Sequence, residues 1–143
     1  MLSGGKKGYY LSQEEAINRR RLISGYVRYK IFLRCINGPT YDGYTEMSFN
    51  LVKIETKPLH IDYKGKGITQ VMINQAPMLP EVLAHNYDGY ILTLPGEMLK
   101  IGENQVRINF EGDYVNNVQG FQRSIEWDDC YVFTNSEPDY ARR

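Results

Sequence analysis

Apolar and polar side chains alternate with a period of two through most of the chain after Leu22. The first such run extends from Val27 to Cys35, with apolar residues at the odd positions and basic residues at most of the even ones. A second run, from Thr45 to Leu51, follows turn residues at Asn37–Pro39 and Asp42–Gly43. Because successive side chains of a β-strand point to opposite faces, both runs are predicted to be half-buried strands that pair as an antiparallel hairpin.

The rest of the chain consists of short runs of the same kind, separated by Gly, Pro, Asn or Asp. Further strands are predicted near residues 59–63, 71–73, 90–92, 106–110 and 130–134. Residues 75–85 contain two prolines and are expected to form a surface loop, with one helical turn at residues 80–84. The pattern therefore predicts a mostly β fold, an antiparallel sandwich or open curved sheet of about seven or eight strands.

One helix signal precedes the strands. Ser12 and Glu15 have the S-x-x-E spacing of a capping box, in which each residue's side chain accepts a hydrogen bond from the other's backbone amide. Acidic residues in the first turn and Arg19–Arg21 in the last turn both suit the helix dipole. We therefore predict a short amino-terminal helix at residues 13–22, preceded by a tail of residues 1–10.

Length and charge limit the possible organisation and partners. The chain has 143 residues, enough for one hydrophobic core, so residues 11–143 are expected to form a single domain. Lys plus Arg and Asp plus Glu both number 17, which leaves no overall field to attract nucleic acid. We therefore expect no nucleic-acid partner. No stretch approaches the roughly 18 apolar residues that cross a bilayer, so no membrane span is expected either.

The two cysteines, Cys35 and Cys130, are far apart in the sequence and form no closely spaced ligand pair. Two thiols in a domain of this size fit a reducing compartment better than a disulfide-stapled secreted scaffold, although their redox state stays open. We expect an intracellular protein, with the cytoplasm as the default and an organellar or cytoskeletal assembly as open alternatives.

The residue types needed for catalysis or metal binding do not occur at useful spacings. His60 and His85 belong to no HExxH pair or comparable motif, so no metal site is expected. Cys35 continues the apolar face of its strand, where a buried, inert thiol is expected rather than a nucleophile activated by His60. We expect no catalytic residue and no cofactor in this chain.

Three other features have structural interpretations. Gly65-Lys66-Gly67 is followed by a strand pattern rather than a helix start, so we predict a hairpin turn rather than a phosphate-binding loop. Asp128-Asp129 is predicted to be an acidic turn before the last strand, because it lacks the ligand spacing of a calcium loop. The 12 tyrosines are scattered, as strand propensity alone would place them.

Several segments resemble the amino-terminal β domain of M1-family zinc aminopeptidases, the aminopeptidase N group. The most specific are Gly120-Phe121-Gln122-Arg123 and the segment from Tyr131 to Arg143, which contains T-N-S-E-P-D-Y-A-R-R. The latter resembles the family signature Y-x-x-T-Q-x-E-P-x-x-A-R-R. Residues Leu11–Ala16 and Gly43–Phe49 resemble the family's leader helix and second strand, so the resemblance covers nearly the whole chain in collinear order.

The resemblance implies a saddle-shaped antiparallel β domain that covers one side of a catalytic domain. It also implies a role for Glu137, at the position where the family glutamate holds the free α-amino group of a peptide by charge-assisted hydrogen bonding. Asn135 stands where the family has glutamine and is one methylene shorter. Both residues are therefore vestigial substrate-binding candidates, because the sequence contains neither HExxH nor GxMEN.

We expect a non-catalytic structural or interaction subunit derived from such a domain and packed in a larger assembly. Strands absent from the family fold would leave a sheet edge just beyond Arg143, and protein neighbours are expected to cover it. The alternative is an amino-terminal fragment of an active zinc aminopeptidase, which an in-frame HExxH downstream would favour. A free-standing peptide- or carbohydrate-binding module that uses the tyrosines is a third possibility.

Overall fold

The computed structural model describes residues 12–35, 38–55, 59–115 and 120–135. Within these residues the fold is mostly β, as predicted, with nine strands, two α-helices and one 3-10 turn. The elements in chain order are α1 Gln13–Leu22, β1 Ile23–Arg34, β2 Thr40–Leu51, β3 His60–Asp62, β4 Gly67–Ile73, β5 Ala76–Pro77, α2 Pro80–Asn86, β6 Ile91–Thr93, η1 Gly96–Met98, β7 Gly102–Asp113, β8 Gly120–Glu126 and β9 Asp129–Asn135.

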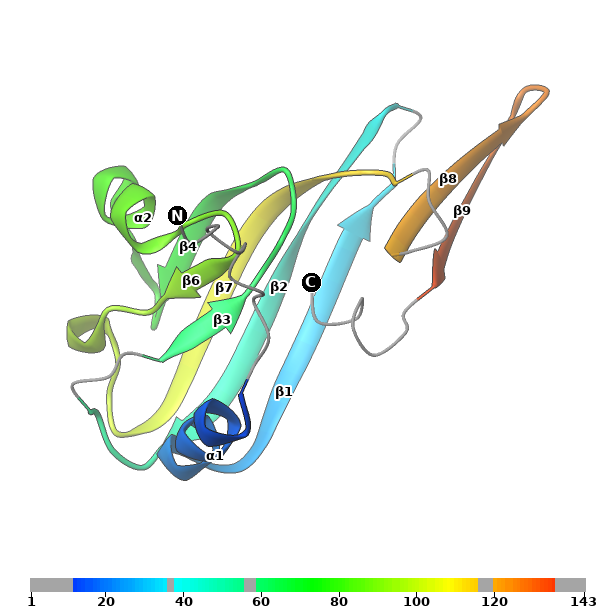
Figure 1. The fold of residues 1–143 in the computed structure, drawn as a ribbon. Coiled ribbons are helices and arrows are strands. Elements are labelled where there is room, and N and C mark those ends of the chain that lie inside the picture. Colours follow the sequence, from blue (N-terminus) through cyan, green and yellow to red (C-terminus); the bar gives the residue numbers. More distant parts are fainter. Residues whose placement is uncertain (1–11, 36–37, 56–58, 116–119, 136–143) are drawn as a thin grey trace, which may run out of the picture.

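The strands form one large antiparallel sheet and two small ones. The large sheet has five strands in the order β1-β2-β7-β4-β5, so β1 lies at one edge. The two-stranded β3–β6 sheet lies in front of β7 and β4, with α1 and α2 at either end of this layer (Figure 1). The β8–β9 hairpin projects away from the large sheet beside the free end of β1 (Figure 1).

The hydrophobic core lies between the large sheet and the β3–β6 layer. Alternate residues of β2, β4 and β7 point to this side, and Leu92 of β6 meets them from the other. The buried apolar residues are Leu22, Met47, Phe49, Leu51, Leu59, Val71, Ile73, Met78, Leu92, Leu94, Leu99, Val106, Ile108 and Phe110. Their period of two is the physical origin of the strand signal in the sequence.

Helix α1 begins and ends where the sequence predicts. The Glu15 amide donates to the Ser12 hydroxyl at 3.1 Å and the Ser12 amide donates to the Glu15 carboxylate at 2.9 Å, so both halves of the capping box form. These hydrogen bonds from Ser12 hold the pKa of Glu15 below its usual value. Arg19 then reaches β3, where its guanidinium lies 3.2 Å from the Asp62 carboxylate and joins the helix to the covering layer.

A tight turn between β4 and β5 is anchored by two asparagines. Asn74 and Gln75 both have positive φ, 50° and 69°, as a two-residue hairpin turn requires. The Asn74 side chain donates to Asn104 at 2.9 Å and accepts from the Gln105 amide at 3.0 Å. Asn104 is completely buried and also bonds to Lys100 and Gly102, so this network connects the turn to the start of β7.

Two local predictions are wrong in part. Residues 75–85 are not a plain loop, because β5 and the whole of α2 lie between Ala76 and Asn86. Residues Gly65–Gly67 do not make a hairpin turn, because β3 pairs with β6 and not with β4. In the second case the partner of β3 lies about 30 residues further along the chain, so the turn composition of residues 65–67 could not identify it.

Aromatic packing holds the base of the β8–β9 hairpin against the large sheet. Phe121 of β8 meets Tyr41 of β2 edge-on, with ring centroids 4.8 Å apart, and Tyr114 lies 5.1 Å from Tyr41 and 5.4 Å from Phe121. Burial raises the pKa of the Tyr114 phenol. The base of the hairpin is therefore packed, whereas its far end extends away from the sheet (Figure 1).

Candidate protein-interaction surface

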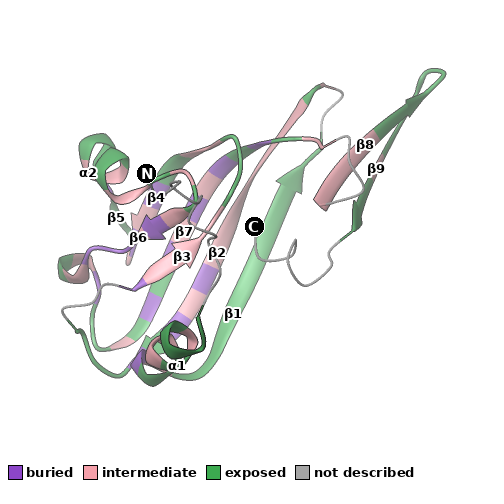
Figure 2. Cartoon of the chain, viewed as in Figure 1, coloured by how far each residue is buried: buried purple, intermediate pink, exposed green. Residues whose placement is uncertain are grey.

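Strand β1 is the most exposed long strand of the sheet. It has 12 residues, and the last 11 are all exposed. Figure 2 shows β1 exposed along its length, beside β2 and β7 with their buried positions. The prediction that this strand is half-buried is therefore wrong, because the residues that the structure describes place no layer over either of its faces.

The exposed side chains on one face of β1 continue the rows of the core. Tyr29 pairs with Met47, which in turn pairs with Val106 and is buried. Ile31 occupies the same place in the next row, opposite Thr45. Tyr29 and Ile31 are 63% and 62% exposed, so the layer that covers the core face of the sheet does not extend over β1. An apolar sheet face that ends in this way is typical of an interaction surface.

A bulge divides β1 into two parts. Ser24 pairs with Asn50 and Arg28 pairs with Ser48, so β1 has extra residues between these two positions that β2 lacks. Gly25 within the bulge has a φ of +71°, a conformation that glycine adopts without steric cost. Residues 28–34 therefore form the regular part of the edge, in continuous register with β2.

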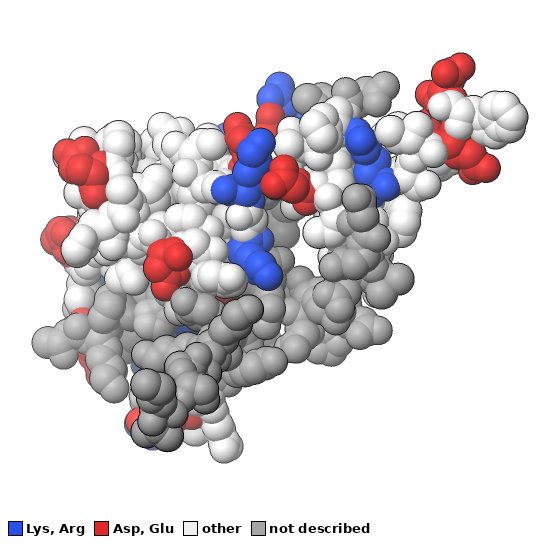
Figure 3. Space-filling model, turned by 45° about the horizontal axis from the view of Figure 1, so that its top comes forward, with Lys and Arg blue, Asp and Glu red and all other residues white. Residues whose placement is uncertain are grey.

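The opposite face of β1 carries cations and aromatic rings. The Phe32 and Tyr44 rings stack at 5.3 Å, and the Arg107 guanidinium lies 3.8 Å from the Tyr44 ring centroid. Glu46 accepts from Arg107 at 3.1 Å and lies 3.9 Å from the ammonium of Lys30. Figure 3 shows Lys and Arg side chains lying among Asp and Glu on a neighbouring face, with no extended patch of one sign among the residues it colours.

An ion pair fixes the end of this surface. Arg34 of β1 donates to the Asp42 carboxylate of β2 through Nε at 2.8 Å and also through a terminal nitrogen. The hydrogen bond from Arg34, and then its charge, hold the pKa of the Asp42 carboxyl below its usual 3.8. Because both groups are exposed to solvent, the pair is expected to orient the end of β1 more than to stabilise the fold.

We expect Asp42→Asn to remove the small, pH-dependent contribution that Asp42 makes to the free energy of unfolding. The pKa of Asp42 is lower in the folded protein than in the unfolded chain, so its contribution is complete above pH 3.8 and disappears as the pH falls through the folded value. Urea unfolding of the wild type and of Asp42→Asn should therefore differ at pH 7 and converge near pH 2. Glu103→Gln, at an exposed position of β7, should give no such convergence.

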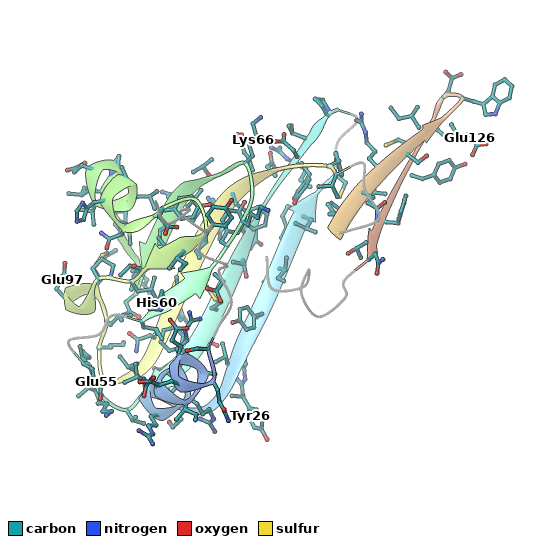
Figure 4. All side chains as sticks on the ribbon, in the orientation of Figure 1. Tyr26, Glu55, His60, Lys66, Glu97 and Glu126 are labelled. Carbon is teal, nitrogen blue, oxygen red and sulfur yellow. The ribbon has the colours of Figure 1, made fainter. Side chains whose placement is uncertain are left out.

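Of the two site residues expected from the resemblance, the structure describes only Asn135. Asn135 ends β9, opposite Gly120, and is exposed, whereas Glu137 lies outside the described residues. No set of three or more His, Cys, Asp or Glu side chains in the described ranges is arranged to hold a metal ion. Figure 4 shows His60 on β3, within the covering layer and away from the hairpin that carries Asn135.

One of the two cysteines differs from expectation. Cys35 and Cys130 are free thiols at exposed positions, so the prediction that Cys35 is buried and inert is wrong. The reason is the same as for the whole of β1: Cys35 continues a face that is apolar in sequence but uncovered in the structure. The acidic turn predicted at Asp128–Asp129 is confirmed for Asp128, which with Trp127 connects β8 to β9, whereas Asp129 is already the first residue of β9.

The surface around β1 was not a candidate site in the sequence. Its signal was present as a strand that carries three basic residues, Arg28, Lys30 and Arg34, and no acidic one. The same applies to the exposed aromatic residue at the hairpin turn, Trp127, which follows a run of ordinary strand residues. Neither feature could be assigned to an edge before the strand order was known.

No model of a known protein family matches this chain, and no curated protein sequence matches it. The resemblance to M1-family aminopeptidases therefore stays a prediction. Neither described helix combines the length and the apolar character needed to cross a bilayer.

Proposed function

We propose that this protein is a non-catalytic interaction subunit that binds a protein neighbour along β1. The observation that carries the proposal is the combination of a long edge strand with an exposed apolar face that continues the core. An edge strand offers backbone N–H and C=O groups to a partner strand, and the apolar row offers area to bury. Both are present over the same residues, 28–34.

The proposal moves the expected contact to a different edge. The sequence suggested that neighbours cover an edge just beyond Arg143, which lies outside the described residues. Within the described part of the chain, β1 is paired on one side only, by β2. Natural sheets usually protect such an edge by a covering segment or by charge, and β1 retains exposed Tyr29, Ile31 and Phe32 there.

Replacing Ile31 by aspartate is expected to release the neighbour without unfolding the protein. A charge in the centre of the apolar row should weaken binding at least about tenfold, as loss of a central anchor does at other interfaces. The measurement is native mass spectrometry of the complex purified around the tagged chain, with titration of the identified neighbour against wild type and variant. Thermal unfolding should show that the variant is folded.

Ile101→Asp is the matched control, because Ile101 is 68% exposed and lies just before β7, at the end of the sheet where Gly102 pairs with Leu51, away from residues 28–34 of β1. It introduces the same charge at a similarly exposed isoleucine and should leave the complex intact. The proposal is wrong if the purified wild-type chain has no stoichiometric neighbour, or if the Ile31→Asp chain retains it with unchanged affinity.

A further inference from the structure

The far end of the β8–β9 hairpin presents a single large aromatic side chain to solvent. Glu126 pairs with Asp129, so Trp127 and Asp128 form a two-residue turn, and Trp127 has a φ of 57°. The indole is 92% exposed, more than any other large apolar side chain among the described residues. Figure 4 labels Glu126 at this end, on the side of the molecule opposite Glu97.

The same turn is acidic. Glu126, Asp128 and Asp129 are all exposed and surround Trp127 in sequence, while Arg123 lies further back on β8. Figure 3 shows the end of the hairpin as acidic side chains around uncoloured ones. We call residues 126–129 the hairpin tip. It combines an aromatic anchor with three carboxylates, a composition suited to a cationic, partly apolar recess.

A recess of this kind lies beside β1. A groove of about 410 Å³ opens on the polar face of β1, β2 and β7. Its cationic lining residues are Arg28, Lys30 and Arg107, and its one carboxylate is Glu46. Within the described residues Arg28 forms no ion pair, so the groove keeps an excess of positive charge. We call it the β1 groove.

Size and chemistry both fit the hairpin tip. Pockets that enclose small organic groups have volumes of about 300–1,000 Å³, so the β1 groove has room for one indole ring. A cation above an indole face is stabilised by the ring quadrupole. Arg28 lines the groove and is placed to supply such a cation, whereas Arg107 already lies over the Tyr44 ring. The carboxylates of Asp128 and Asp129 would meet the remaining cations as charge-assisted hydrogen bonds.

We propose that the hairpin tip of one copy of this chain docks in the β1 groove of a second copy. The inference rests on the proposed function in that it takes β1 as the interacting strand, but it concerns the polar face of that strand, opposite the row of Tyr29 and Ile31, and names the occupant of that face. Each copy carries one tip and one groove, so the contact gives either a reciprocal pair or a head-to-tail chain. The hairpin of the same copy does not line the groove.

Direct pairing of two β1 strands is a poorer alternative. Residues 28–34 carry Arg28, Lys30 and Arg34 with no acidic residue, and all three point to the same face. Antiparallel pairing of two such strands would bring these cations close together, which is unfavourable. The charge of the strand therefore selects against a second β1 and in favour of an acidic segment, which the hairpin tip supplies.

The test uses sedimentation equilibrium of the full chain over a range of protein and salt concentrations. The wild type is expected to exceed its monomer mass of 16.6 kDa as its concentration rises, and added salt should weaken the association. Arg28→Glu in the groove, or Asp129→Lys at the tip, should each weaken it at least tenfold. Trp127→Ala should do the same, with unfolding curves like that of the wild type.

Mixing the two charge-reversed chains gives the decisive measurement. The unchanged tip of the Arg28→Glu chain can then enter the unchanged groove of the Asp129→Lys chain, and the two reversed groups can face each other in a second contact. The mixture should therefore associate where each variant alone does not. Glu97→Lys is the control, because Glu97 is exposed and lies at the opposite end of the molecule from the tip (Figure 4). It should associate like the wild type.

A wild-type chain that stays monomeric at every concentration would overturn the inference. So would association that survives both Trp127→Ala and Asp129→Lys, because the occupant would then not be the hairpin tip. Either result leaves the proposed function to its own test, since a different neighbour could still depend on Ile31. If Ile31→Asp instead leaves the binding of every neighbour unchanged, the proposed function itself is wrong.

Discussion

Replacing Asn104 by leucine is expected to lower the free energy of unfolding by about 3 kcal/mol. The Asn104 side chain is completely buried and accepts from the Lys100 amide at 2.9 Å, while its amide group donates to the carbonyls of Lys100 and Gly102. Leucine has a similar size but leaves these backbone groups and Asn74 without their partner. Each buried polar group left unpaired costs about 1–3 kcal/mol.

Urea unfolding followed by circular dichroism measures this effect. Asn50→Leu is the matched control, because Asn50 is an exposed residue of β2 and the same substitution removes no buried hydrogen bond there. We expect a change of less than about 0.5 kcal/mol for the control. Equal destabilisation by the two substitutions would show that the buried network does not anchor the start of β7.

Gly43→Ala is expected to destabilise the protein by about 2–3 kcal/mol and to loosen the end of β1. A Cβ atom at position 43 would lie 2.2 Å from the carbonyl oxygen of Phe32, which belongs to the backbone of β1 and cannot rotate away. Strand β1 would have to move from β2 over the residues that pair around Leu33. Amide hydrogen exchange at the end of β1 should therefore become faster.

Gly67→Ala provides the comparison. Gly67 also lies in a strand, β4, but a Cβ atom added there has nothing within 4 Å. Alanine at this position is expected to be neutral or slightly stabilising, because it reduces the conformational freedom of the unfolded chain. If the two substitutions had the same effect, the close approach of β1 to Gly43 would not exist in solution.

Local sequence patterns predicted the elements whose signals are contained in neighbouring residues. The capping box at Ser12 and Glu15 predicted the start of α1, and alternation predicted β1, β2 and β7 and the pairing of the first two. These signals depend on the geometry of one turn or one strand, which a single sequence contains. The fold class follows from the same information.

Strand order and burial could not be read in this way. The strand from Val27 to Cys35 has the alternation of a half-buried strand, yet its apolar row is exposed because β3 and β6 cover this face of the sheet over β7 and β4 and do not extend to β1 (Figure 1). Likewise, Gly65–Gly67 has turn composition, but its flanking strands belong to different sheets. Both outcomes depend on contacts between segments that are distant in the sequence, and the local residue composition does not determine such contacts.

The candidate surface was missed for the same reason. The sequence directed attention to Glu137 and Asn135, and these positions lie at or beyond the end of β9. The residues that matter in our proposal, Arg28, Ile31 and Trp127, are ordinary strand or turn residues until the edge position of β1 and the exposure of the hairpin are known. Their significance is a property of topology rather than of a motif.

The bulge between Ser24 and Arg28 also limits aggregation through the exposed edge of the sheet. A long, flat edge strand is a template for uncontrolled growth of sheets from molecule to molecule. Here the extra residues around Gly25 interrupt the register, and the basic side chains that follow repel an identical strand. Both features are expected to oppose fibril formation at this edge, and deleting the bulge should make the protein aggregate.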